Sequence, residues 1–191
     1  MSELRPEALT RRLLNHAGTT YADEAGIQLD DKPMPLFELL VLCLLASKPI
    51  DATVAMRAAR EIFSEHLRTP HAALAAERQT RIAALGPPGS ARSPEGAAPP
   101  LVDNATALRD EYHGDLRGLA QRSGQDVKAA KRLLEQFTGI GDTGADIFLR
   151  EVQDVWTWVR PYFDNRATAA AADLGLPPDP AELASLAPRT S

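Results

Sequence analysis

The chain has 191 residues, 44% of them apolar, which suffices for a hydrophobic core in one large domain or in two small lobes that share a core. A single cysteine, Cys43, excludes an internal disulfide, a four-thiolate cluster and a structural zinc–thiolate site. The formal net charge of −5 argues against nucleic-acid binding, although phosphate contacts need only a local patch.

Abundant alanine and few aromatic residues favour an all-α fold over a β-sandwich. An irregular polar stretch is expected at 19–26, and Pro33 and Pro35 mark a boundary after it. The helix that follows is almost entirely apolar, so it should be buried on all sides, with Cys43 as a small buried hydrophobe. Hydrophobic spacing and breaker residues predict helices at 6–16, 36–47, 52–67, 71–85, 103–112, 115–121, 126–137, 142–159, 163–174 and 180–186.

The segment 86–100 is rich in Gly and Pro and has no periodicity, which predicts a mobile surface loop. The N-terminus lacks a signal pattern, and the longest apolar run is about half a bilayer span. We therefore expect a soluble, cytoplasmic monomer that does not contact membranes. The four histidines show no ligand spacing, so no metal site is expected.

The segment Gly139-Ile140-Gly141 predicts a tight hairpin between two helices. Both glycines can adopt positive φ and expose backbone N–H groups, while Ile140 would plug the gap between the helices. The second helix begins with unpaired N–H groups and the positive end of its dipole, which together bind phosphate without lysine or arginine. The alternative is an ordinary turn between helices with a glycine C-cap.

Three segments of the chain carry a family resemblance, and they occur along the chain in the same order as in the family. They are Phe137–Ala145 (FTGIGDTGA), Phe163–Arg166 (FDNR) followed by Asp173–Leu176 (DLGL), and Leu36–Leu40 (LFELL) followed by Leu44–Asp51 (LLASKPID). They resemble the hairpin, the aspartate segment and the buried helix of the endonuclease III superfamily of helix-hairpin-helix DNA glycosylases. Together they cover most of residues 36–177.

The resemblance implies two all-α lobes with the active site in the cleft between them. A helical barrel lobe would take residues 33–159 and carry the hairpin, and a second lobe would join 1–32 to 160–191. The implied partner is duplex DNA with a damaged base, and the implied location is cytoplasmic and nucleoid-associated. The family's cluster-binding cysteines have no counterpart after Leu176, so this resembles the subgroup that lacks the iron–sulfur cluster, and no cofactor is expected.

Asp164 stands at the family's catalytic aspartate, which stabilises cationic charge on the sugar or helps water attack it. The same aspartate also suits the N-cap of a helix, and the two roles are compatible. Thr143 stands at the position of the lysine that forms a Schiff base in bifunctional members. Threonine cannot do this, so the resemblance implies base removal without lyase activity.

The resemblance also assigns DNA contacts to Gly139, Ile140, Gly141, Thr143 and Gly144. Lys48 occupies the position of a glutamine that fills the gap left by a flipped base; its alternative is a solvated lysine at a helix end.

Tyr21 and Glu24 would reach the cleft from the second lobe, or else be surface turn residues. Trp156 and Trp158 are two residues apart on an expected helix, so they should not face the same side. One should be core, and the other would contact the other lobe or line the cleft. Trp156 is our candidate for a residue that lines the substrate pocket.

The sequence thus favours a monofunctional DNA glycosylase. A non-catalytic helix-hairpin-helix DNA-binding protein is the first alternative, motivated by the missing lysine and the acidic charge. A helical protein-interaction module is the second.

Overall fold

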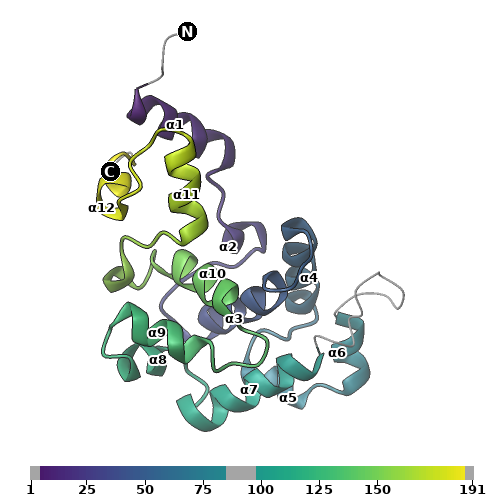
Figure 1. The fold of residues 1–191 in the computed structure, drawn as a ribbon. Coiled ribbons are helices and arrows are strands. Elements are labelled where there is room, and N and C mark those ends of the chain that lie inside the picture. The colour runs from purple at the N-terminus through teal and green to yellow at the C-terminus, as the bar shows by residue number, and fades with distance from the viewer. Residues whose placement is uncertain (1–4, 85–97, 188–191) are drawn as a thin grey trace. The chain divides into compact units, whose positions relative to one another are not determined.

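The computed structural model describes residues 5–84 and 98–187, and every regular element in these two ranges is a helix (Figure 1). The predicted all-α class is therefore confirmed. Within these ranges, no helix is long and apolar enough to cross a membrane. The two-lobed glycosylase architecture stays a prediction.

The chain divides into two compact units. The terminal unit comprises Met1–Thr20 and Arg160–Ser191, and the central unit comprises Tyr21–Val159. Residues 21–32, which the prediction placed in the second lobe, fall in the central unit. This segment is bonded to central helices: the backbone N–H of Ala22 donates to Glu151, for example, at 3.0 Å.

The terminal unit contains helices near both ends of the chain. They are α1 (Pro6–Ala17), α11 (Asn165–Asp173) and α12 (Pro180–Ser185). Side chains of Asp164 and Asp179 accept hydrogen bonds from backbone N–H groups in the first turns of α11 and α12, which explains where these two helices begin. The three helices predicted for these segments are confirmed, with slightly shifted ends.

The core of the central unit forms around α3 (Pro33–Ala46). Every residue from Pro35 to Leu45 is buried, which confirms the prediction of a helix covered on all sides. It packs against α4 (Ala52–Ser64), α7 (Ala98–Tyr112) and α10 (Asp142–Val152). Each large apolar side chain removed from water here contributes about 1.5–3 kcal/mol, so α3, with its continuous run of buried residues, contributes strongly to the unit's hydrophobic stabilisation.

Shorter helices complete the central unit. They are α2 (Tyr21–Glu24), α5 (Pro70–Ala75), α6 (Arg78–Ala84), α8 (Arg117–Arg122), α9 (Val127–Leu134) and the 3-10 turn η2 (Thr157–Val159). The helix α2 corrects the prediction of an irregular stretch at 19–26. Its four residues form one turn that is held in place by its contacts with α10, which no local pattern reveals.

Several helix ends differ from the prediction for identifiable reasons. α3 starts at Pro33 rather than Leu36, because proline suits the first turn, where the backbone N–H has no helical partner. The expected helix 71–85 is interrupted at Ala76, whose backbone is extended. The guanidinium of Arg81 donates to the carbonyl oxygens of Ala73, at 3.3 Å, and of Ala76, which satisfies groups left open by the break.

α7 begins at Ala98, earlier than the predicted position 103. Residues 98–100 are therefore helical instead of belonging to the expected loop. The remainder of that predicted loop, 86–97, lies outside the described residues.

The burial of Cys43 leads to a chemical prediction. The side chain is fully buried in α3, and burial raises the pKa of the Cys43 thiol well above its usual range. Because only the thiolate is nucleophilic, the folded protein should react with a maleimide far more slowly than the same protein in guanidinium chloride at equal pH. Mass spectrometry of timed samples measures both rates, and rapid labelling of the folded protein would contradict the buried position.

Candidate nucleic-acid interface

The predicted hairpin joins two helices that pack against each other. α9 ends at Leu134, α10 begins at Asp142, and the connection folds back with Ile140 N–H donating to the carbonyl of Phe137 at 3.0 Å. Gly139 has φ +78°, the left-handed region that favours glycine. Ile140 is buried, as expected for an apolar plug between the helices.

Two glycines of the hairpin allow it to press against the C-terminal end of α3. A Cβ at Gly139 would lie 2.7 Å from Leu44 Cδ1, and a Cβ at Gly144 would lie 2.1 Å from Ser47 Oγ. Neither distance leaves room for a side chain. These glycines therefore set how closely the hairpin approaches the buried helix, in addition to shaping the turn.

Gly141 differs from the other two glycines because it faces open space. It is exposed, occupies the N-cap of α10, and a Cβ built on it would meet nothing within 4 Å. No side chain of the described residues caps α10 at this position. The amides of the first turn of α10 are therefore left uncapped, with the positive end of the helix dipole behind them.

Asn104 of α7 supports the hairpin from a second direction. Its Nδ2 donates to the carbonyl of Thr138 at 3.0 Å, and the side chain is only 3% exposed. Sequence reasoning missed this residue. The available signal was a polar asparagine within the apolar spacing of Leu101, Ala105 and Leu108, which marks a buried side chain that needs a partner.

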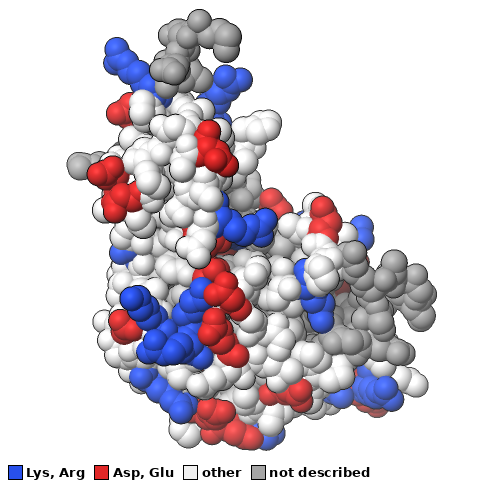
Figure 2. Space-filling model, in the orientation of Figure 1, with Lys and Arg blue, Asp and Glu red and all other residues white. Residues whose placement is uncertain are grey.

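Charges of both signs lie next to the hairpin, where Figure 2 shows cationic and acidic side chains side by side over α9 and α10. Lys131 Nζ lies 2.7 Å from an oxygen of Asp142 and 2.5 Å from one of Asp146. Desolvation lowers the pKa of Lys131, but the hydrogen bonds to these carboxylates outweigh it and leave the pKa above its usual value. The amine is thus a protonated ion-pair partner rather than a nucleophile.

Two further predicted DNA contacts lie near the same end of α3. Thr143 is exposed in the first turn of α10. Lys48 is half-buried and directly follows Ser47, the residue against which Gly144 packs. The structure thus brings Lys48 and the predicted hairpin residues together within the central unit.

Asp164 belongs to the terminal unit and caps α11. One carboxylate oxygen accepts the backbone N–H of Ala167 at 2.8 Å, which confirms the predicted capping role. The hydroxyl of Thr168 donates to the Asp164 carbonyl at 3.3 Å. The catalytic role of this carboxylate, and the cleft that it would share with the hairpin, stay predictions.

Tyr21 and Glu24 lie on α2, and both are half-buried within the central unit. The guanidinium of Arg150 sits 4.6 Å from the centre of the Tyr21 ring. Arg150 also pairs with Glu151, which accepts the N–H of Ala22. These contacts dock α2 on the C-terminal half of α10, so Tyr21 has a structural role in the central unit instead of extending from a second lobe.

Trp156 is a core residue, with 3% exposure, which confirms that one of the two tryptophans is buried. Its indole N–H donates to Asp31 at 2.9 Å. The prediction that Trp156 and Trp158 face different sides is wrong, because their rings stack with centroids 5.4 Å apart. α10 ends at Val152, so the helical geometry behind that prediction does not apply. Both rings border a hollow of about 660 Å³.

Comparisons with protein-family models, with curated proteins and with solved structures find no match for this chain. The family resemblance therefore rests on the residues themselves. Within residues 5–84 and 98–187, no group of three or more His, Cys, Asp or Glu side chains is arranged to hold a metal ion.

The close approach of the hairpin to α3 predicts unequal effects of two alanine substitutions. Gly139 and Gly114 share φ +78°, but only Gly139 has a neighbour at the position of a Cβ. Gly114→Ala should lower the free energy of unfolding by about 1 kcal/mol, the cost of the backbone conformation. Gly139→Ala should lose at least about 1 kcal/mol more, because Leu44 must move. Urea denaturation measures both, and equal losses would argue against the contact.

Proposed function

We propose that this protein binds the backbone of duplex DNA through its hairpin and removes a damaged or mispaired base without lyase chemistry. The observation that carries the proposal is the uncapped first turn of α10 at Gly141, presented by a hairpin that Gly139, Gly144 and Asn104 hold in place. Helix N-termini of this kind bind phosphate through backbone N–H groups. Such contacts hold the backbone without reading the base sequence.

The resemblance to helix-hairpin-helix glycosylases supports DNA as the source of the phosphate. Lys48 adds a cation beside the hairpin, at the position where family members fill the gap left by an extruded base. The hairpin therefore combines an anion site with a neighbouring side chain that suits base flipping.

Base removal is assigned to Asp164 because of the family resemblance. The hydrogen bond from Ala167 fixes the orientation of the carboxylate at the start of α11, as a positioned acid–base group requires. Lyase chemistry would need an unprotonated amine. Thr143 has none, and Lys131 beside it is held protonated by Asp142 and Asp146.

A non-catalytic DNA-binding protein is the second candidate. It is favoured by the capping bond of Asp164, which gives this residue a structural role whether or not it is catalytic. Both candidates require duplex binding at the hairpin, and base release separates them.

Substitution of Gly141 tests the hairpin as a phosphate site. Asp or Asn at this N-cap would accept the free N–H groups of α10 and should change stability by only a few tenths of a kcal/mol. Gly141→Asp also adds a negative charge, so it should weaken binding to a duplex containing a tetrahydrofuran abasic-site analogue by about tenfold or more. Fluorescence anisotropy measures the affinity.

Gly141→Asn is the matched control, since asparagine has the shape of aspartate and caps the helix without adding a charge. It should show a smaller loss of affinity than Gly141→Asp, because only the competition for the amides remains. Unchanged affinity in both variants, with thermal unfolding like that of the wild type, would exclude the hairpin as the DNA contact.

Base release tests the enzymatic part of the proposal. Incubation with a panel of lesion-bearing and mismatched duplexes, followed by alkaline cleavage, should reveal an abasic site on at least one substrate. Asp164→Asn should reduce that release at least about a hundredfold, the usual range for a lost acid–base group, because the amide cannot act as a base. Asparagine is as good an N-cap as aspartate, so the fold should be retained.

Asp164→Ala provides the comparison, since it loses both the cap and the carboxylate and should unfold at a lower temperature. Borohydride should trap no covalent complex with DNA. Duplex binding without base release on any substrate would favour the non-catalytic candidate, and efficient trapping would contradict the roles given to Thr143 and Lys131.

A further inference from the structure

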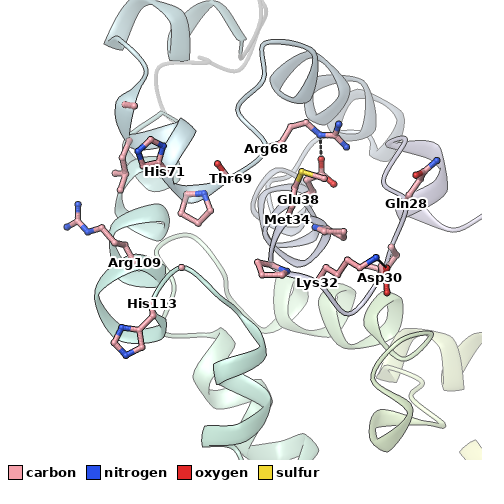
Figure 3. Close-up of a pocket in the computed structure, with 17 residues that line it drawn as sticks. Gln28, Asp30, Lys32, Met34, Glu38, Arg68, Thr69, His71, Arg109 and His113 are labelled. Carbon is pink, nitrogen blue, oxygen red and sulfur yellow. Dashed lines mark hydrogen bonds and ion pairs between the residues drawn. The ribbon is translucent and has the colours of Figure 1, made fainter.

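A second feature of the central unit is a pocket of about 1190 Å³ at the N-terminal end of α3. Its walls come from three parts of the chain: the start of α3 with the segment before it, the start of α5 with the segment before it, and the end of α7 with the turn after it (Figure 3). Its lining includes Met34, Pro35, Glu38, Arg68 and Leu74. A concave, mainly apolar site with a few convergent polar groups is the usual form of a small-molecule site.

The pocket is remote from the proposed DNA contact. The hairpin packs on Leu44 and Ser47, whereas Met34 and Glu38 line the pocket. Met34 and Ser47 are separated by nearly the whole of α3, which corresponds to about 20 Å along the helix axis. A ligand in the pocket would therefore occupy a site of its own, and the inference does not depend on DNA binding.

One wall of the pocket contains an ion pair whose carboxylate is buried. Glu38 is 1% exposed, and its Oε1 accepts a hydrogen bond from Nε of Arg68. Its other oxygen, Oε2, has no hydrogen-bond partner among the described residues. A buried acceptor left unpaired costs about 1–3 kcal/mol, so a ligand that donates to it would gain the corresponding stabilisation.

Arg68 supplies the complementary donors. Arg68 lines the pocket, its side chain is 40% exposed, and only its Nε is bonded to Glu38, so the two NH2 groups of the guanidinium can still donate. An acceptor and donors thus lie side by side, with their formal charges already balanced. A neutral group that both donates and accepts matches this pair better than an ion of either sign.

Apolar side chains supply much of the remaining lining. Met34, Pro35 and Leu74 contribute apolar surface. The cations at the edge have carboxylate partners of their own, Lys32 with Asp30 at 2.5 Å and Arg109 with Asp110 at 2.6 Å. Figure 3 shows the side chains of Arg109 and His113 extending away from Glu38.

We propose that this pocket binds a neutral, largely apolar small molecule that carries a planar amide or lactam group. The amide N–H donates to the carboxylate of Glu38, and the amide carbonyl accepts from the guanidinium of Arg68. A ligand carboxylate at the same place would be repelled by the carboxylate of Glu38, and a ligand ammonium group would be repelled by the guanidinium of Arg68. The apolar walls hold the body of the ligand.

Probes that share a phenyl body and differ only in the polar group test the proposal. They are benzamide, benzoate, benzylamine and toluene. In protein labelled with ¹³C at the methionine methyl groups, benzamide should shift the NMR signal of Met34, which lines the pocket. Met56 is fully buried in α4 and outside the pocket, so its signal should stay unchanged. A Met34→Leu variant assigns the signals.

Benzamide should bind with a dissociation constant about fivefold lower than each of the other three probes, the effect of one net hydrogen bond. Glu38→Gln should remove most of that preference while keeping the side-chain volume. Ala75→Trp, at an exposed position on the pocket wall, should weaken binding of every probe without lowering the unfolding temperature.

The wild-type titration decides the matter even if a variant folds poorly. A Met34 signal that does not move with benzamide, or that moves equally with all four probes, would overturn the proposal. A preference for benzoate or benzylamine would overturn it as well. In a stably folded Ala75→Trp protein, unweakened binding would show that the ligand sits elsewhere.

Discussion

The burial of α3 on all sides from Pro35 to Leu45 is the constraint on which the central unit depends. A helix satisfies its own backbone hydrogen bonds, so it can be surrounded on all sides where an irregular segment could not. Only its ends leave backbone N–H and C=O groups without a helical partner. The C-terminal end, at Leu44 and Ser47, receives the hairpin, and the N-terminal half supplies Glu38 to a pocket. The two candidate sites thus follow from one apolar helix.

The sequence predicted the features that depend on local chemistry. The apolar run identified α3, the aspartate before α11 identified its N-cap, and the glycines identified the hairpin. Boundaries set by tertiary contacts were missed. No pattern in the surrounding residues marks the break at Ala76, where the carbonyl accepts a hydrogen bond from Arg81. None marks the end of α10 at Val152 either. Helical periodicity continues through both positions, so it predicts longer helices than the packing allows.

The same distinction applies to the candidate sites. Gly139, Gly141 and Thr143 are neighbours in the sequence, so a motif can identify them together. Asn104 supports the hairpin from 34 residues away, and Arg68 pairs with Glu38 across 30 residues. Neither pair has a spacing that a single sequence can reveal, because the partners meet only after the helices pack. Supporting contacts are for this reason harder to predict than the residues they support.

The acidic character of the chain becomes easier to understand when the hairpin is compared with a lysine-based phosphate site. Lys131, which links α9 to α10, already forms ion pairs with Asp142 and Asp146. Under the proposed function, backbone amides at Gly141 would carry the phosphate contact, and these carry no formal charge. Counterion release on DNA binding grows with the number of phosphates neutralised by lysine and arginine. Binding through amides should therefore depend on salt less steeply than binding by a basic protein, and a net charge of −5 is compatible with it.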